Sequence, residues 1–271
     1  MPVFTAMDRT PVIAALESGV LTLMLNRPQR LNAMSPGLIE AMNHELGRAR
    51  DDKDIRAVLL TGIGRGFCAG ADLAGSGPGD PDAAGQPDLG AAMDRLFNPM
   101  IRAMRALPKP IVSAVNGVAA GVGMSFALAS DIVIAGKSAS FLQAFARIGL
   151  LPDGGSTWFL PRLVGDQRAR ALAMLAPQIP AEQAKQWGLI WDVVEDGALM
   201  KTATELARRL AEGPALSLAR IKEAMNRASG NDLAAQLDVE RDFQRELGRS
   251  EDFKEGVAAF LAKRKPAFKG K

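Results

Sequence analysis

The chain contains very few residues of the two types that most often make metal sites, disulfides and catalytic triads. Among 271 residues there is one cysteine, Cys68, and one histidine, His44. A single cysteine excludes an intrachain disulfide framework and every metal site built from several cysteines. This usage fits a reducing compartment, and we expect a cytoplasmic protein.

The lone histidine also limits the possible chemistry. His44 lies in LIEAMNHELGRAR, whose apolar residues recur at helical spacing, so it is interpreted as a solvated helix residue. A Ser-His-Asp or Cys-His hydrolase would depend on it. The sequence also lacks a G-x-S-x-G elbow, an H-E-x-x-H motif, a phosphate-binding G-x-x-x-x-G-K-[ST] loop and a complete G-x-G-x-x-G.

Long apolar runs are missing as well. Gly, Pro or a charged residue interrupts each of them well before the ~18–20 residues that a membrane span needs. The first residues, MPVFTAMDRTPV, carry charge after a very short apolar stretch and have no hydrophobic segment typical of a secretion signal. We therefore expect neither a signal peptide nor a membrane partner.

Charge is nearly balanced, with 33 Lys and Arg against 30 Asp and Glu. The excess of +3 is most visible in the last residues, KRKPAFKGK (263–271). A short basic tail of this kind is not a nucleic-acid-binding surface, and no nucleic-acid partner is expected.

The periodicity that is present indicates an α/β fold. VIAALE (12–17) and VLTLMLN (20–26) flank a Ser-Gly as in a hairpin, and buried strands are predicted in RAVLLTG (56–62), PIVSAV (110–115) and DIVIAG (131–136). Between them, helices are predicted over 36–50, 92–106 and 121–130. From about residue 157 onward, strand patterns disappear and only helices are expected.

We expect two parts. Residues 1–200 would form the α/β core with the active site, and residues 201–271 an all-helical region. The segment 74–91, rich in Gly, Pro and Asp, is predicted to be a loop, either a lid over a site or a surface insertion.

Two glycine-rich turns follow buried strands, in GRGFCAGADL (64–73) and VNGVAAGVGMSFALASD (115–131). Glycine lets backbone N–H groups approach a ligand, and a helix N-terminus adds free N–H groups and a positive dipole end. Each turn alone is also explained by close helix–sheet packing. Together, they could each supply one N–H to the same carbonyl oxygen.

Four segments, LNRPQRLNAM (25–34), GRGFCAGADL, AVNGVAAGVG with SDIVIA, and GLLPDGG, resemble in order and spacing the motifs of the enoyl-CoA hydratase/isomerase family, the crotonase superfamily. The resemblance covers nearly the whole chain. The C-terminal half is most similar to the subgroup of isomerases that act on ring-1,2-epoxyphenylacetyl-CoA in phenylacetate catabolism. The resemblance implies a crotonase-like core of repeated ββα units, assembled as a homo-oligomer, either a trimer or a dimer of trimers.

The resemblance also implies how the substrate is held. An acyl-CoA thioester would place its carbonyl oxygen between the backbone N–H groups of Ala71 and Val122, the oxyanion hole. Contacts with the CoA part are implied for five further residues, those of the last helical region reaching a neighbouring subunit: Arg30, Ala69, Leu73, Phe260 and Lys263. Coenzyme A is part of the substrate, and no separate cofactor or metal is implied.

Hydratases of the family use two glutamates, and the corresponding positions here hold Ser125 and Phe145, which are assigned to the acyl pocket. Neither can activate water, so hydration by the usual pair is not expected. The remaining acid is Asp153, in LLPDGG. By its neighbours alone it is a turn or cap residue, whereas the family's isomerases place their catalytic carboxylate there.

The sequence therefore predicts an acyl-CoA isomerase in which Asp153 removes a proton from Cα. Apolar neighbours such as Leu150 and Leu151 would raise the pKa of this carboxyl toward that of a useful base. The expected reactions are ring-1,2-epoxyphenylacetyl-CoA to oxepin-CoA and Δ3-to-Δ2 enoyl-CoA isomerisation. Two alternatives stay open: an enoyl-CoA hydratase with unusual groups, and a non-catalytic acyl-CoA- or RNA-binding member, which would require a broad basic face.

Overall fold

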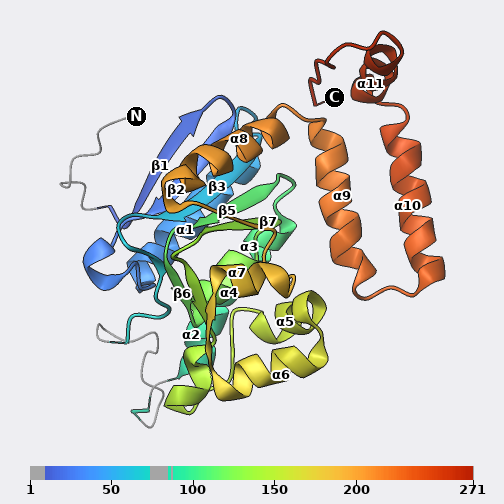
Figure 1. Cartoon of the computed structure of the whole chain (residues 1–271). Coiled ribbons are helices and arrows are strands. Elements are labelled where there is room, and N and C mark those ends of the chain that lie inside the picture. The colour runs from blue at the N-terminus through green and yellow to red at the C-terminus, as the bar shows by residue number, and fades with distance from the viewer. Residues whose placement is uncertain (1–9, 74–84, 87, 271) are drawn as a thin grey trace.

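The computed structural model describes residues 10–73, 85, 86 and 88–270, and it contains two sheets (Figure 1). The larger has six strands in the order β1-β2-β3-β5-β7-β10, and the smaller has four in the order β4-β6-β8-β9. The strands of the larger sheet are β1 (Val12–Glu17), β2 (Val20–Leu25), β3 (Ala57–Gly62), β5 (Ile111–Val115), β7 (Ile132–Gly136) and β10 (Asp192–Val194). Those of the smaller are β4 (Gly66–Cys68), β6 (Val118–Ala120), β8 (Ser140–Leu142) and β9 (Gln178–Pro180).

A repeated unit connects the two sheets. After β3, β5 and β7, the chain turns within a few residues into β4, β6 and β8, which lie parallel in the smaller sheet. Helical segments follow each short strand. This arrangement confirms the expected core of repeated ββα units.

The larger sheet is covered on both faces, which explains its continuous apolar strands. Strands β3 and β5 are buried throughout. Helix α8 (Leu199–Ala211) packs on one face through Ala203, Ala207 and Ala211, which are spaced one helical turn apart. The other face belongs to the main core, which includes α1 (Pro36–Asp51) and α3 (Asn98–Ala106).

The helices predicted in the first half are present. Helix α1 begins after Ser35, whose hydroxyl accepts from the N–H of Leu38, and α4 covers Val122–Leu128. The segment predicted as one helix over 92–106 starts earlier and is irregular, because α2 (Leu89–Ala92) runs into a π-helical turn (Met93–Phe97) before α3. Such turns are frequent at functional sites.

The expectation that strands disappear after residue 157 is wrong. β9 pairs antiparallel with β8, and β10 pairs parallel with β7 at the edge of the larger sheet. Each has three residues, which is too short for a period of two to be recognised.

The other short helices of the core are η1 (Pro28–Arg30), η3 (Ala144–Ile148), α5 (Ser156–Val164), α6 (Asp166–Leu175), α7 (Ala181–Gln186) and η4 (Asp196–Ala198).

The last three helices extend from this core (Figure 1). Helices α9 (Ala215–Ala228) and α10 (Leu233–Leu247) form an antiparallel pair, and α11 (Glu251–Leu261) lies above α10 in this view. Helix α8 itself packs on the sheet, and the helices beyond Ala211 form the extension. Among the described residues, no helix is both long and apolar enough to cross a membrane.

Candidate active site

A mainly apolar cavity of about 330 Å³ lies where the two glycine turns, the π-helical turn and the η3–α5 connection meet. This volume is within the range of small-molecule sites. Its lining residues are Ala69, Gly70, Ala71, Leu73, Leu89, Met93, Phe97, Gly121, Val122, Ala144, Phe145, Ile148, Leu150, Leu151, Pro152 and Asp153. The structure thus brings six residues singled out by sequence to one cavity: Ala69, Ala71, Leu73, Val122, Phe145 and Asp153. Their catalytic and binding roles stay predictions.

The first glycine turn carries Ala71 just after β4. The N–H of Met34 donates to the carbonyl of Gly70 at 2.7 Å, and the N–H of Asp72 donates to the carbonyl of Met34 at 3.0 Å. These bonds hold Ala71 from both sides, while its own N–H has no acceptor among the described residues. An N–H fixed in this way is available to a ligand.

The second glycine turn carries Val122, the first residue of α4, whose N–H likewise has no acceptor among the described residues. Gly121 has φ +52° and ψ −131°, a conformation open only to glycine. A Cβ on Gly121 would lie 3.9 Å from Cα of Gly70, so the two turns are in contact. The two free N–H groups therefore belong to adjacent turns, as the oxyanion hypothesis requires.

An ion pair that the sequence reasoning missed fixes the first turn. Arg27 donates through Nη2 to Oδ2 of Asp72 at 2.7 Å, and its Nη1 donates to the carbonyl of Ala33. Both side chains are largely buried. The signal was available, because Arg27 and Asp72 lie inside the two quoted motifs, LNRPQRLNAM and GRGFCAGADL, but their pairing over 45 residues could not be read from either.

Asp153 lies in the turn between η3 and α5. Burial raises the pKa of this carboxyl to about 6. Asp153 is one of the cavity's lining residues, and its Oδ1 is buried and has no hydrogen-bond partner among the described residues. The side chain does not cap α5 either, since Gly155 occupies the cap position. The turn thus holds a poorly solvated carboxylate, which suits a general base.

The two positions of the hydratase glutamates differ in placement. Phe145 lines the cavity. Ser125 is fully buried on α4 and is not among the lining residues; its hydroxyl donates to the carbonyl of Asp153 at 2.8 Å. This differs from the expectation that Ser125 belongs to the acyl pocket. The periodicity of α4 did not reveal which face Ser125 occupies, because all seven residues of the helix are buried.

Of the five residues predicted to contact CoA, only Ala69 and Leu73 line the cavity. Arg30 is exposed at the end of η1, and Phe260 and Lys263 are exposed at the end of α11, where Phe260 is 82% accessible. Figure 1 shows α11 on the far side of the molecule from α2, one of the helices beside the cavity. Within one chain, therefore, α11 and the cavity do not meet. The suggested lid, 74–91, lies mostly outside the described residues.

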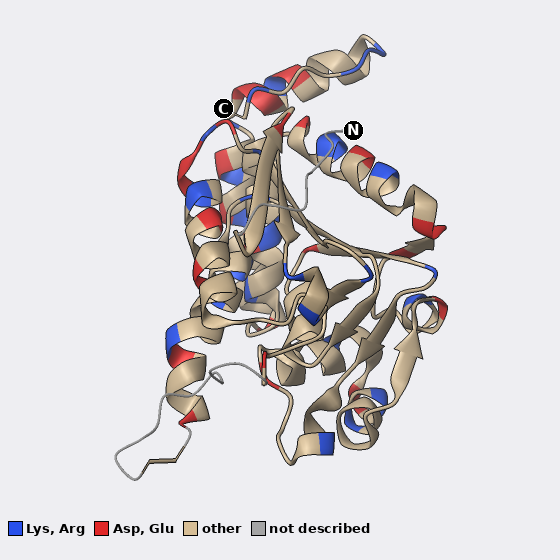
Figure 2. Cartoon of the chain, turned by 90° about the vertical axis from the view of Figure 1, so that its left-hand side faces the viewer, with Lys and Arg blue, Asp and Glu red and all other residues tan. Residues whose placement is uncertain are grey.

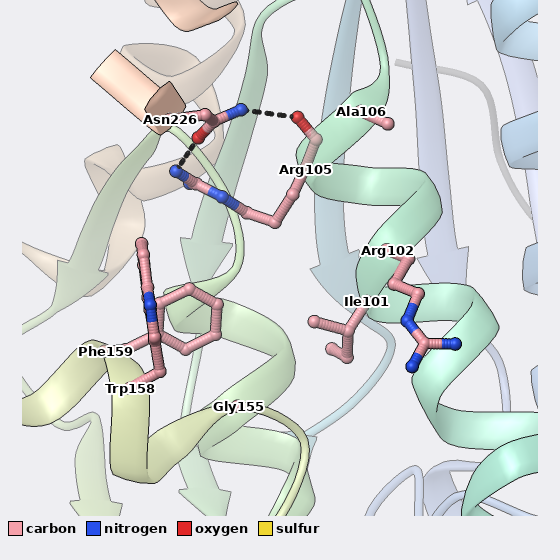
Figure 3. Close-up of a pocket in the computed structure, with 8 residues that line it drawn as sticks. All are labelled: Ile101, Arg102, Arg105, Ala106, Gly155, Trp158, Phe159 and Asn226. Carbon is pink, nitrogen blue, oxygen red and sulfur yellow. Dashed lines mark hydrogen bonds between the residues drawn. The ribbon is translucent and has the colours of Figure 1, made fainter. Parts of the chain in front are cut away.

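A second, more open hollow of about 720 Å³ borders α5 (Figure 3). Arg105 of α3 donates to the side-chain oxygen of Asn226 on α9, and Asn226 donates back to the carbonyl of Arg105 at 2.8 Å. The guanidinium lies 6.0 Å from the ring centre of Trp158 and 5.8 Å from that of Phe159. Burial lowers the pKa of Arg105. This contact attaches α9 to the core beside the helix that follows Asp153.

Blue Lys and Arg positions are interspersed with red Asp and Glu positions along the helices in Figure 2. In the C-terminal helices, ion pairs such as Arg220 with Glu246 at 2.7 Å and Arg264 with Glu255 at 2.6 Å neutralise several cations. A nucleic-acid-binding role therefore gains no support from this face.

Fold and cavity together define an enzyme of the crotonase type, with ββα units, two glycine turns with free N–H groups, and one buried acid. Residues 15–271 match the sequence profile of the Enoyl-CoA hydratase/isomerase family. The chain belongs to this family.

Individual relatives agree. The 1,2-epoxyphenylacetyl-CoA isomerase of Escherichia coli K12 is 52% identical over 96% of this chain and 98% of its own. A probable enoyl-CoA hydratase of Rhodobacter capsulatus is 44% identical over 94% and 96%. Among solved structures, an enoyl-CoA hydratase from Bacillus anthracis, 31% identical, superposes with a TM-score of 0.89 over 96% of this chain and 100% of its own.

Proposed function

We propose that this enzyme is an acyl-CoA isomerase in which Asp153 is the base and the N–H groups of Ala71 and Val122 form the oxyanion hole. One observation carries the proposal. Asp153 is the sole carboxylate among the described residues that line the cavity, and burial raises its pKa to about 6. A reaction that needs one proton-transferring group fits this cavity better than one that needs two.

A Δ3-to-Δ2 shift moves one proton from Cα to the γ-carbon. The carboxylate of Asp153 takes the proton from Cα, and the electron pair of that C–H bond moves onto the thioester oxygen. The Ala71 and Val122 N–H groups stabilise the enolate charge, and each such donor contributes ~3–4 kcal/mol in well-studied enzymes. Asp153 then returns the proton to the γ-carbon as the double bond moves, so the enzyme ends unchanged.

The neighbours of Asp153 support isomerisation over hydration. Phe145 lines the cavity where a hydratase has an acid, and a phenyl ring moves no proton. Ser125 is fully buried and does not line the cavity, and its hydroxyl donates to the carbonyl oxygen of Asp153. Addition of water would need a second group to activate it, and the lining residues offer none among those described.

The substrate is proposed by chemical class and by analogy. The lining is mostly aliphatic and aromatic, which suits an acyl group that carries a ring or a short chain. The Escherichia coli relative is named for 1,2-epoxyphenylacetyl-CoA, and we propose ring-1,2-epoxyphenylacetyl-CoA as substrate, converted to oxepin-CoA, with 3-enoyl-CoA as a second substrate. The chemistry needs no cofactor besides the coenzyme A of the substrate.

We also propose a homo-oligomer, a trimer or dimer of trimers. Large apolar side chains on α10 and α11 are more than half exposed in the described part of the chain, namely Leu233, Leu237, Phe253, Phe260 and Leu261. Burial against another subunit would remove these from water and bring Phe260 and Lys263 near a neighbour's cavity.

Three substrates assayed in parallel test the function: the epoxide thioester, a 3-enoyl-CoA and crotonyl-CoA, with product identity determined by mass spectrometry. We expect isomers from the first two and little 3-hydroxyacyl-CoA from the third. Hydration of crotonyl-CoA at ~10 per second, a typical enzyme turnover, would contradict the proposal.

A further inference from the structure

A chain of three buried side chains supports the turn that carries Asp153. Nε2 of Gln143 donates to Oγ of Ser156 at 2.7 Å, the hydroxyls of Ser156 and Ser125 lie 2.7 Å apart, and Oγ of Ser125 donates to the carbonyl oxygen of Asp153 at 2.8 Å. None of the three is more than 1% exposed. These three side chains do not line the cavity themselves, and their hydrogen-bonded series ends at the backbone carbonyl of Asp153, the proposed base.

The direction of the chain is fixed by its two ends. Two carbonyl oxygens lie within reach of the single hydrogen of Ser125, that of Asp153 at 2.8 Å and that of Gly121 at 3.4 Å. Both can only accept, and the shorter contact is to Asp153, so Ser156 must donate to Ser125. Ser156 is left as an acceptor, which requires the NH₂ group of Gln143 to face it. The opposite amide orientation would leave two hydroxyl oxygens facing each other at 2.7 Å without a hydrogen between them.

This orientation leaves Oε1 of Gln143 buried with no hydrogen-bond partner among the described residues. Buried acceptors are nearly always paired, and an exception is typical of a functional site. Within the described part of the chain, the amide of Gln143 is therefore held by the one bond that it donates to Ser156.

The packing between the turn and α4 is equally tight. Gly154 has φ +56°, and a Cβ added to it would lie 2.8 Å from Cβ of Ser125 and 3.1 Å from Cγ2 of Val122. The turn therefore rests directly on the helix whose first residue supplies an oxyanion N–H. One helix sets the positions of both the proposed base and the proposed oxyanion donor.

We propose that Ser125, held by Ser156 and Gln143, is a positioning residue that fixes Asp153 relative to the N–H of Val122. It also excludes the hydratase arrangement, because the space that a glutamate at 125 would need is filled by Gly154 and Ser156. The proposal rests on the proposed function, in which Asp153 is the base.

The test compares Ser125→Ala with Ser113→Ala in α-proton exchange of a bound acyl-CoA in deuterated water. Ser113 and Ser130 form another buried hydroxyl pair, at 2.8 Å, which makes Ser113→Ala a matched control for the loss of a buried hydroxyl. We expect Ser125→Ala to lower kcat by ~10–100-fold, the range for a base displaced by up to ~1 Å, with KM nearly unchanged. Ser113→Ala should leave kcat within ~2-fold, a small change on a scale where tenfold corresponds to about 1.4 kcal/mol.

Two more readouts distinguish positioning from plain stability. A released turn admits water, so the pH midpoint of exchange in Ser125→Ala should fall below that of the parent enzyme. Ser156→Ala keeps the bond from Ser125 to Asp153 and should give a smaller loss in kcat; it also serves if Ser125→Ala fails to fold.

Asp153→Asn separates the two proposals. If it abolishes exchange while Ser125→Ala and Ser156→Ala retain full kcat, Asp153 is the base and the positioning proposal is wrong. If Asp153→Asn keeps exchange, both proposals fall together. If Ser125→Ala lowers kcat in the parent and has no further effect in the Asp153→Asn background, Ser125 acts through Asp153, as proposed.

Discussion

Nη2 of Arg27 lies 2.7 Å from Oδ2 of Asp72, and this ion pair joins the segment after β2 to the turn that carries Ala71. The side chains are 20% and 10% exposed. A charge-assisted hydrogen bond shielded from water is stronger than an exposed one, and removing Arg27 takes this guanidinium from a largely buried carboxylate. The pair therefore stabilises the backbone that carries Ala71, the first proposed oxyanion donor.

We expect Arg27→Ala to lower the free energy of unfolding by about 1.5–3 kcal/mol, the range for a charged hydrogen bond. The exchange rate should fall as well, because the Ala71 N–H loses its fixed position. Denaturant unfolding and α-proton exchange measure the two effects. Arg170→Ala is the control, since its pair with Asp166 is more than half exposed and should contribute at most about 1 kcal/mol. Equal losses in both variants would contradict a special role for Arg27.

Exchange should depend on pH through Asp153. Its pKa is raised to about 6 by burial, and only the deprotonated form accepts the Cα proton. We expect the rate to rise with pH and to reach half its maximum near pH 6 in the free enzyme. A rate that is flat between pH 5 and 8 would show that another group takes the proton.

Asp153→Asn should lower exchange by at least ~10²-fold, the low end for a lost general base. It should also stabilise the fold above pH 6. A carboxyl whose pKa is raised on folding stabilises the protein fully only below its ordinary pKa near 3.8, and this contribution is lost as pH rises through about 6. At pH 8 the variant should gain at most about 3 kcal/mol, from a shift of about two units, reduced by the residual solvation of Asp153.

Melting curves at pH 8 and pH 4 check the sign of this stability effect. The gain should be present at pH 8 and nearly gone at pH 4. Asp166→Asn, at an exposed position on α6, should change stability little at either pH. Destabilisation of Asp153→Asn at pH 8 would restore the interpretation of Asp153 as a structural turn residue.

Placing glutamates at both hydratase positions should not create a hydratase. Ser125→Glu would push a long charged side chain against Gly154 and Ser156, and overpacking alone costs ~1–3 kcal/mol. We expect a lower melting temperature and loss of isomerisation in this variant, whereas Phe145→Glu alone faces the cavity and should be better tolerated. Crotonyl-CoA hydration by the double variant, with isomerisation retained, would contradict this steric argument.

The exposed apolar surface of α10 and α11 predicts self-association. Light scattering at micromolar concentration should give a mass several times 28.7 kDa. Lys263→Ala should weaken acyl-CoA binding about 3–5-fold, as for one solvent-exposed charge pair, while Lys254→Ala, at an exposed position on α11, should not. A stable monomer would remove the proposed route by which Phe260 and Lys263 reach a neighbour's cavity.

The sequence by itself determined the main strands, the first helices and the two glycine turns, because these depend on local periodicity and on glycine's backbone freedom. The family motifs, read with the chain order, also brought Ala71, Val122 and Asp153 together as one hypothesis. The three-residue strands β9 and β10 escaped detection, since such segments become strands only by pairing with β8 and β7.

Tertiary structure alone decided which groups support the site. The pairing of Arg27 with Asp72 spans 45 residues, and the chain from Gln143 to Asp153 joins three elements through side chains. The surroundings of the Ser125 side chain depend on what packs against α4. This helix is buried on every side and therefore has no amphipathic pattern that would reveal them. The raised pKa of Asp153 also depends on tertiary structure, because it results from the burial of the carboxyl in the assembled fold.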